Sequence, residues 1–321
     1  MRLLFFSLHL RTEAFLMDNV LLKSAAFIFL IALGYFLKCK GVFGKQDYKI
    51  LVRIVTCITM PCAVLISFAS YPADFSLLMI VGLGLGMNCL MLLSGFLLSK
   101  KYPRRTRAVW LNCVPGYNIG AFAMPFVQSF LSPASLVGTC LFDLGNALMC
   151  NGTTFALSKN ILDGTKGVNF KRIGQTLLHS VPFLAYVIFL LLTLLQIKIP
   201  EQVITFVTPM ANANAFLAMM MVGMMLDLRI EKAIFKEVIG MLATRFIGAA
   251  LASAAFFFLL PLSLPIRQAL AVTVFAPVSM VSTAFTPSAG GDPAVAACVN
   301  SFSIIICIPC IMTLLAVFGI L

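Results

Sequence analysis

The stretch NCVPGYNIGAFAMP, residues 112–125, is apolar enough for a membrane, yet it carries two prolines, two glycines and two asparagines. An ordinary membrane-spanning helix would place leucine at such positions. In lipid every backbone N–H and C=O needs a partner, so an interrupted helix persists only where protein surrounds it or where it lines a watery cavity. The stretch therefore predicts a broken helix inside the membrane.

The composition of the chain is that of an integral membrane protein. Of its 321 residues, 61% are hydrophobic and 11% are charged, and the mean hydropathy is +1.04. The apolar runs have the length of about 20 residues that a helix needs to cross a bilayer. We predict an all-α polytopic membrane protein with ten transmembrane helices, at residues 19–38, 48–70, 75–99, 108–131, 134–158, 180–198, 201–226, 237–260, 265–287 and 293–320.

The basic residues predict the orientation of these helices. Connections 38–49, 100–107, 159–172 and 227–236 hold 16 of the 23 Lys and Arg residues, whereas the alternate connections hold only Lys198 and Arg267. By the positive-inside rule both termini face outward, in a multi-pass protein of the cell membrane. The net charge of +12 thus reflects the lipid bilayer as partner, and we expect no nucleic-acid partner.

The chain divides into two halves of five helices. After a lead-in of residues 1–18, the first half covers 19–158, a cytoplasmic linker covers 159–179, and the second half covers 180–321. An odd number of helices in each half means that homologous halves are inverted relative to each other. The fourth and ninth spans carry matching residues at identical offsets, namely Pro115, Asn118 and Pro125 against Pro277, Met280 and Pro287.

The two matched interruptions predict a substrate site. Broken helices that meet near the midplane create a polar site, with the positive N-termini of the half-helices directed at an anion. Two proline kinks that only shape packing are the alternative. The candidate substrate-binding residues are Pro115, Gly116, Tyr117, Asn118, Pro277, Ser279 and Met280.

Two ionisable residues lie deep in the predicted spans, Asp143 and Arg245. Each should face the protein interior or water, because a charge at the centre of a membrane helix costs roughly 2.5–3.5 kcal/mol. Asp143 and Asn146 share a helix face, where they could hold a proton or a sodium ion or form a buried polar network. Arg245 could attract a carboxylate, pair with Asp143 or extend to the cytoplasmic interface.

Three further polar residues are expected to face the cavity, namely Thr59, Asn212 and Asn214. Amides that face lipid are costly, so Asn212 and Asn214 should face a cavity between parts of the protein.

The sequence favours transport over catalysis. It has no HExxH motif, no Cys/His pair at depth and no second intramembrane Asp, so we expect no enzyme and no metal site. It also lacks a P-loop, so we expect no nucleotide cofactor. We predict a secondary transporter of a small organic anion that works by alternating access, with proton or sodium coupling left open. A channel or membrane receptor, whose broken helices line a pore or a ligand site, is the alternative.

Several motifs resemble those of the auxin efflux carrier family, and the match favours its bacterial type. They are the run from Pro115 to Pro125, LIALGYFLKCKGVF (30–43), TMPCAVL (59–65), FLAMMMVGMMLDL (216–228) and the segment 275–315. The resemblance covers about residues 19–320. That family comprises plant auxin exporters and bacterial carriers of small organic anions.

The resemblance implies two inverted five-helix repeats whose fourth and ninth helices cross, as in bile acid symporters. Helices 1, 2, 6 and 7 would form a scaffold, and helices 3–5 and 8–10 a transport domain. Asn118 matches the family's crossover asparagine, whereas Met280 stands at the corresponding place in the second repeat. The family suggests malate, malonate or another mono- or dicarboxylate as substrate. A homodimer formed through the scaffold helices is a partner arrangement left open.

Overall fold

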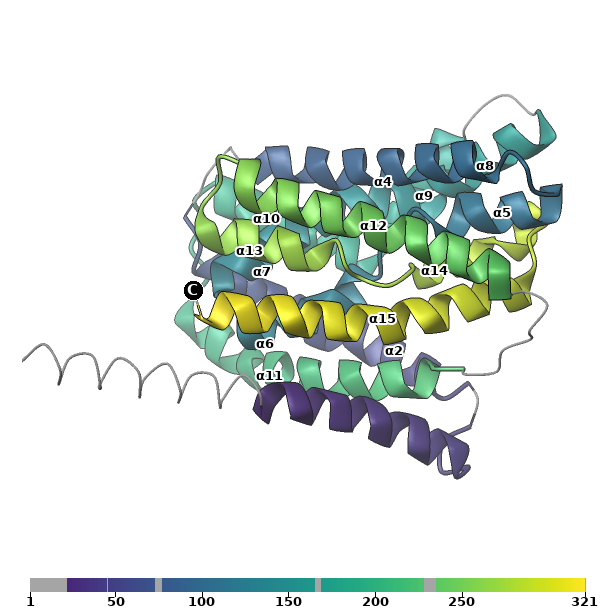
Figure 1. The fold of residues 1–321 in the computed structure, drawn as a ribbon. Helices are drawn as coiled ribbons and strands as arrows, with labels where there is room; N and C mark the ends of the chain where they lie inside the picture. Colours follow the sequence, from purple (N-terminus) through teal and green to yellow (C-terminus); the bar gives the residue numbers. More distant parts are fainter. Residues whose placement is uncertain (1–21, 45, 73–76, 165–168, 228–234, 321) are drawn as a thin grey trace, which may run out of the picture.

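The computed structural model of the protein is a bundle of helices (Figure 1). It describes residues 22–44, 46–72, 77–164, 169–227 and 235–320, so the predicted lead-in of residues 1–18 lies outside the described residues. The described part contains no β-strand, and one isolated antiparallel bridge joins Tyr117 to Val278. The predicted all-α class is therefore confirmed.

The helices after the first one, Leu22–Cys39, carry the labels of Figure 1. In chain order they are α2 (Tyr48–Ile54), η1 (Val55–Thr59), α3 (Met60–Ala69), α4 (Leu78–Ser99), α5 (Arg104–Cys113), η3 (Ile119–Ala123), α6 (Met124–Phe130), α7 (Pro133–Leu148), η4 (Met149–Thr153), α8 (Thr154–Asp163), α9 (Phe170–Leu178), α10 (Val181–Leu194), α11 (Glu201–Met225), α12 (Phe235–Leu259), α13 (Leu264–Thr273), α14 (Met280–Phe285), η6 (Pro287–Ala289) and α15 (Pro293–Ile320).

Seven helices among the described residues are long and apolar enough to cross a membrane. An eighth span forms if α9 and α10, which are bent by 80° at their junction, count together. The chain is thus a multi-pass membrane protein. The other two predicted spans, fourth and ninth, are each divided into short helices.

Each divided span consists of segments too short to cross the membrane alone. The helices α5 and α13 contain 10 residues each, so at 1.5 Å per residue each is about 15 Å long, roughly half the hydrocarbon thickness. Each is followed by irregular chain and then by a second short segment, η3 with α6 in one case and α14 in the other. Neither span therefore reaches the length of an uninterrupted transmembrane helix.

Close backbone packing surrounds the divided spans. The helix α7 packs along both α4 and α13, while α10 and α11 pack against α3. A Cβ added to Gly145 of α7 would strike the carbonyl oxygen of Val81 in α4, and one added to Gly223 of α11 would strike that of Ile31 in the first helix. Small residues at these contacts allow the helices to approach closely, as is common in membranes.

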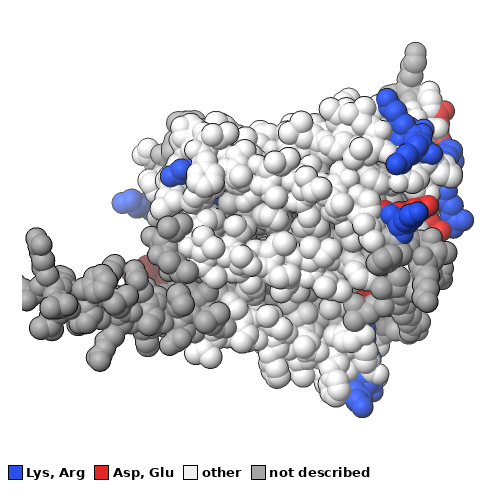
Figure 2. Space-filling model, viewed as in Figure 1, with Lys and Arg blue, Asp and Glu red and all other residues white. Residues whose placement is uncertain are grey.

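Most of the charged residues seen in Figure 2 gather at one end of the molecule, where α5 and α8 lie in Figure 1. Arg104 of α5 forms an ion pair with Asp163 of α8. Its neighbour Arg105 pairs with Asp292, just before α15, at 2.8 Å. The start of α5, the end of α8 and the start of α15 thus share this basic end.

Candidate substrate site

The first interruption separates α5 from η3. Pro115 has no N–H and disfavours continuation of the preceding turn. Gly116 follows with a φ of +82°, a left-handed conformation that glycine adopts without steric cost. A Cβ at Gly116 would also lie 2.7 Å from the Ser282 hydroxyl. These two residues therefore end α5 and redirect the chain.

Side chains of neighbouring helices satisfy the freed backbone N–H groups. The Gly116 N–H donates to Asn88 Oδ1 of α4 at 2.8 Å. The Tyr117 N–H donates to Asn146 Oδ1 of α7 at 3.0 Å, and Asn146 Nδ2 donates to the Tyr117 carbonyl oxygen at 2.8 Å. The interruption is thus held by two buried amides, those of Asn88 and Asn146.

The second interruption lies between α13 and α14 and contacts the first. The Asn118 N–H donates to the Pro277 carbonyl oxygen at 2.9 Å, and the antiparallel bridge joins Tyr117 to Val278. The Ser279 hydroxyl accepts from the N–H of Ser282 at 3.5 Å, at the N-terminus of α14. Both helices break in the segments that the sequence analysis selected, and the two breaks touch.

Arg245 of α12 covers the carbonyl ends of both interrupted helices. Its side chain is buried, with 4% exposure, and therefore does not extend to the interface. No ion pair with Asp143 occurs among the described residues. Instead, its guanidinium donates to the backbone carbonyl oxygens of Cys113 (3.2 Å), Val114 (2.5 Å), Pro115 (3.4 Å), Gly116 (2.9 Å) and Ala276 (3.0 Å).

Arg245 acts on the negative helix ends at the two breaks and not on the positive ones. Carbonyl groups at the C-terminal end of a helix carry partial negative charge, and N–H groups at an N-terminal end carry partial positive charge. The Arg245 guanidinium neutralises the negative ends of α5 and α13. The positive ends at the breaks are the starts of η3, at Ile119, and α14, at Met280.

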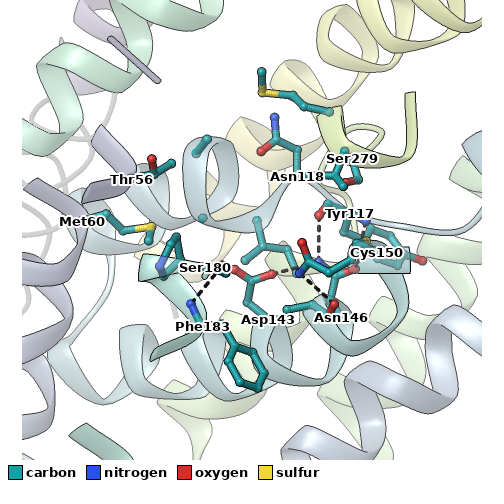
Figure 3. Close-up of a pocket in the computed structure, with 18 of the residues that line it drawn as sticks. Thr56, Met60, Tyr117, Asn118, Asp143, Asn146, Cys150, Ser180, Phe183 and Ser279 are labelled. Carbon is teal, nitrogen blue, oxygen red and sulfur yellow. Dashed lines mark hydrogen bonds between the residues drawn. The ribbon is translucent and has the colours of Figure 1, made fainter. Parts of the chain in front are cut away.

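A cavity of about 390 Å³ lies beside these two helix starts. In Figure 3, Thr56 and Met60 lie across the cavity from Tyr117 and Ser279. Six of the predicted site residues line it, namely Tyr117, Asn118, Asp143, Asn146, Ser279 and Met280.

The other predicted substrate-binding residues, Pro115, Gly116 and Pro277, are not among its lining residues, and neither is Arg245. Arg245 lies directly behind the wall, with its guanidinium carbon 4.9 Å from the centroid of the Tyr117 ring.

The three residues predicted to face the cavity do not line it. Thr59 donates its hydroxyl to Asn214 Oδ1 at 2.9 Å, and Asn214 Nδ2 donates to Gln128 Oε1 at 2.9 Å. These contacts join η1, α11 and α6, so the amide of Asn214 is satisfied inside a helix interface. Asn212 lies on the exposed side of α11. Sequence indicates that such an amide needs a partner but not which partner it finds.

Asp143 is the carboxylate of the cavity. Its Oδ1 accepts from Asn146 Nδ2 at 2.8 Å, and its Oδ2 accepts from the Tyr186 hydroxyl of α10 at 2.8 Å. Its neighbour Asn146 is also one of the two residues that hold the first interruption. The carboxylate is therefore linked to the broken helix on one side and to α10 on the other.

Sequence reasoning did not select two residues of this network, Tyr186 and Asn88. Asn88 Nδ2 donates to Asn146 Oδ1 at 3.2 Å, and Tyr186 also lines the cavity. Asn88 is the only asparagine in its apolar span, as Asn118 is in the segment that follows α5. This isolation was a signal that could have found Asn88, because a buried amide requires partners.

Two donors at the cavity remain without partners. Neither Asn118 Nδ2 nor the Tyr117 hydroxyl has a hydrogen-bond partner among the described residues. Both side chains are at most 8% exposed, and leaving a buried polar group unpaired costs about 1–3 kcal/mol. Both residues line the cavity, although these two donor atoms are themselves buried.

Comparison with known proteins gives one family. Residues 20–163, which include the first interruption and Asp143, match the model of the family described as membrane transport protein. This match confirms the resemblance to the auxin efflux carrier family for the first half of the chain. No curated protein matches the chain.

Proposed function

We propose that this chain, whose residues 20–163 match the model of the membrane transport protein family, is a secondary transporter of a small organic anion that works by alternating access. A cavity of about 390 Å³ suits a mono- or dicarboxylate such as malonate or malate. The unpartnered amide of Asn118 and hydroxyl of Tyr117 would donate to carboxylate oxygens.

The observation that carries this proposal is the position of Arg245. Its guanidinium covers the carbonyl ends of the two interrupted helices and lies 4.9 Å from the Tyr117 ring. The cavity therefore borders positive helix starts without bordering the negative ends. Such fixed dipoles favour an anion in a site from which most water is excluded.

A crossed arrangement of the divided spans fits this role. We assign α5 with η3 and α6 to the fourth of ten spans and α13 with α14 to the ninth, in two inverted repeats. The first helix, α2 with α3, α10 and α11 would form the scaffold, and the remaining helices would form the transport domain. By the distribution of Lys and Arg, both termini would lie on the outer side of the cell membrane. The exposed amide of Asn212 on α11 would be covered if two scaffolds form a homodimer.

Reconstitution tests the proposed function. Purified protein in liposomes should take up radiolabelled malonate or malate with saturable kinetics, and excess unlabelled anion inside should accelerate uptake through counterflow. A channel, the second candidate function, gives neither saturation at low concentration nor counterflow. Protein-free liposomes provide the background. Absence of saturable uptake for both anions would refute this substrate class.

Replacing Asp143 with asparagine tests ion coupling. We expect loss of the stimulation that an inward proton or sodium gradient gives to uptake, because asparagine cannot cycle between a charged and a neutral form. Asparagine can still accept the hydrogen bond of Tyr186 through its carbonyl oxygen, but its amide nitrogen cannot accept from Asn146. Asn146 Nδ2 keeps its bond to the Tyr117 carbonyl oxygen, so we expect a folded protein of somewhat lower stability. Uptake is measured with each gradient present and after its collapse by an ionophore.

Asp163→Asn is the matched control, because Asp163 lies at the end of α8 and pairs with Arg104 outside the cavity. This variant should respond to the gradients like the original protein. If Asp143→Asn also keeps the response, Asp143 is only part of a polar network.

A further inference from the structure

A second cavity, of about 370 Å³, adjoins the first at the basic end of the molecule. We call it the outer cavity; it lies among η4, α8, α9 and the end of α14. Asn151 and Phe285 line both cavities. The outer cavity therefore lies next to the route by which a solute would reach the inner one from this end.

The outer cavity carries positive charge. Lys159 of α8 and Arg172 of α9 line it, and none of its described lining residues is acidic. Neither cation forms an ion pair with another described residue. The nearest acid on α8, Asp163, is already paired with Arg104. Two cations around one concavity raise the local concentration of anions.

The two cations belong to two different helices. Gly164, with a φ of +67°, ends α8 in a left-handed turn. Asn169 caps the N-terminus of α9 by accepting from the Arg172 N–H at 3.0 Å. Because both helix ends are fixed, Lys159 and Arg172 are presented by two ordered helices rather than by a loop.

An aromatic pair lies where the two cavities adjoin. The rings of Phe155 and Phe285 stack with centroids 5.2 Å apart, and Phe155 lines only the outer cavity. Beside them Gly152 has a φ of +127°, which bends the fifth span. A solute that enters from the basic end would meet Lys159 and Arg172 before it passes this pair.

We propose that the outer cavity is a second anion site, in which Lys159 and Arg172 hold the carboxylate of a small organic anion before it passes Phe155 and Phe285 into the inner cavity. The role as a waiting site rests on the proposed transport function. A phospholipid phosphate has the same charge chemistry, so the experiments separate a solute from a lipid headgroup.

The first experiment measures the outer cavity without transport. In a Thr176→Cys variant of the full chain, the rate of labelling at residue 176 is compared for an anionic and a cationic thiosulfonate reagent, with mass spectrometry identifying the labelled peptide. Adding Lys159→Gln and Arg172→Gln should lower the anionic-to-cationic rate ratio about tenfold at low salt, since screening is weak there. Malonate should slow the anionic reagent. An unchanged ratio, or no protection by malonate, would overturn the proposal.

Ser70→Cys is the matched control. Ser70 is exposed at the C-terminal end of α3 and does not line the outer cavity. Its rate ratio should not respond to neutralisation of Lys159 and Arg172. A parallel change at both positions would mean a general effect of net charge and would also contradict the site.

The second experiment measures malonate uptake in liposomes of neutral lipid. The double variant Lys159→Gln/Arg172→Gln should raise KM about threefold to tenfold at low salt with little change in maximal rate, and high salt should reduce the difference. Lys159→Arg/Arg172→Lys should keep the original KM. If KM is unchanged in neutral lipid but the double variant loses a response to added anionic lipid, the site belongs to a headgroup and the solute proposal fails.

The two proposals fail in different ways. If the original protein takes up no malonate or malate, the proposed function fails, while malonate protection of residue 176 still reports on the outer cavity. If the original protein shows saturable uptake and the double variant has the same KM, the proposed function stands and only the outer site is refuted.

Discussion

Replacing Arg245 with methionine should abolish transport and lower the melting temperature of the purified protein by about 5–10 °C. Five carbonyl oxygens from two chain segments would lose their donor. Each buried polar group left without a partner costs about 1–3 kcal/mol. The loss should be partial because the carbonyl groups of α5 and α13 can rearrange. Differential scanning fluorimetry and liposome uptake measure the two effects.

Arg267→Met is the matched control for this variant. Arg267 of α13 also donates to a backbone carbonyl oxygen, that of Phe257, at 2.9 Å, but it lies far from the interruptions along its helix. We expect a loss of stability of about 1 kcal/mol and normal transport. Arg245→Lys should be intermediate, since an ammonium group lacks the planar fork that reaches two chain segments. Normal stability and transport in Arg245→Met would disprove the role assigned to this guanidinium.

Replacing Asn118 with alanine should weaken malonate binding about 10-fold to 100-fold, which corresponds to one lost hydrogen bond to a charged group. Stability should be unchanged or slightly higher, because the substitution removes a buried donor that has no partner among the described residues and alanine keeps the backbone N–H that donates to Pro277. Titration calorimetry measures the affinity. The shift in melting temperature with malonate provides a second measurement.

Asn112→Ala should have the opposite effects on stability and on malonate affinity. Asn112 lies in the same stretch, but its amide donates to Ala108 and Ser158 at 2.8 Å each. Its loss should destabilise the protein and leave the malonate affinity of the folded fraction unchanged. If Asn118→Ala binds malonate like the original protein, Asn118 does not contact the substrate.

The interruptions were predictable because their cause is local. Pro115 and Pro277 lack the N–H that a helix requires, and this holds in any surroundings. The pairing of Asp143 with Asn146 was also predictable, since residues three apart share a helix face. Their hydrogen bond of 2.8 Å follows from helix geometry alone.

Contacts between distant segments were not predictable in this way. The bond between Tyr186 and Asp143 joins α10 to α7, and that between Thr59 and Asn214 joins η1 to α11. Each depends on how two helices are placed in space, which hydrophobic periodicity does not determine. The sequence located Arg245 at depth in a span, but its carbonyl partners come from two breaks that only the fold brings together.

The backbone bridge between the two breaks has a mechanical consequence. Since the Asn118 N–H is bonded to Pro277 and Tyr117 is bridged to Val278, sliding these two stretches past each other would break backbone contacts. If the protein works by the alternating access proposed above, we expect the two breaks to move together and the motion to occur at another helix interface, such as that between α7 and α10. The ligand would then keep the same contacts whichever compartment it faces, and concentration alone would set the direction of net flow unless an ion is coupled.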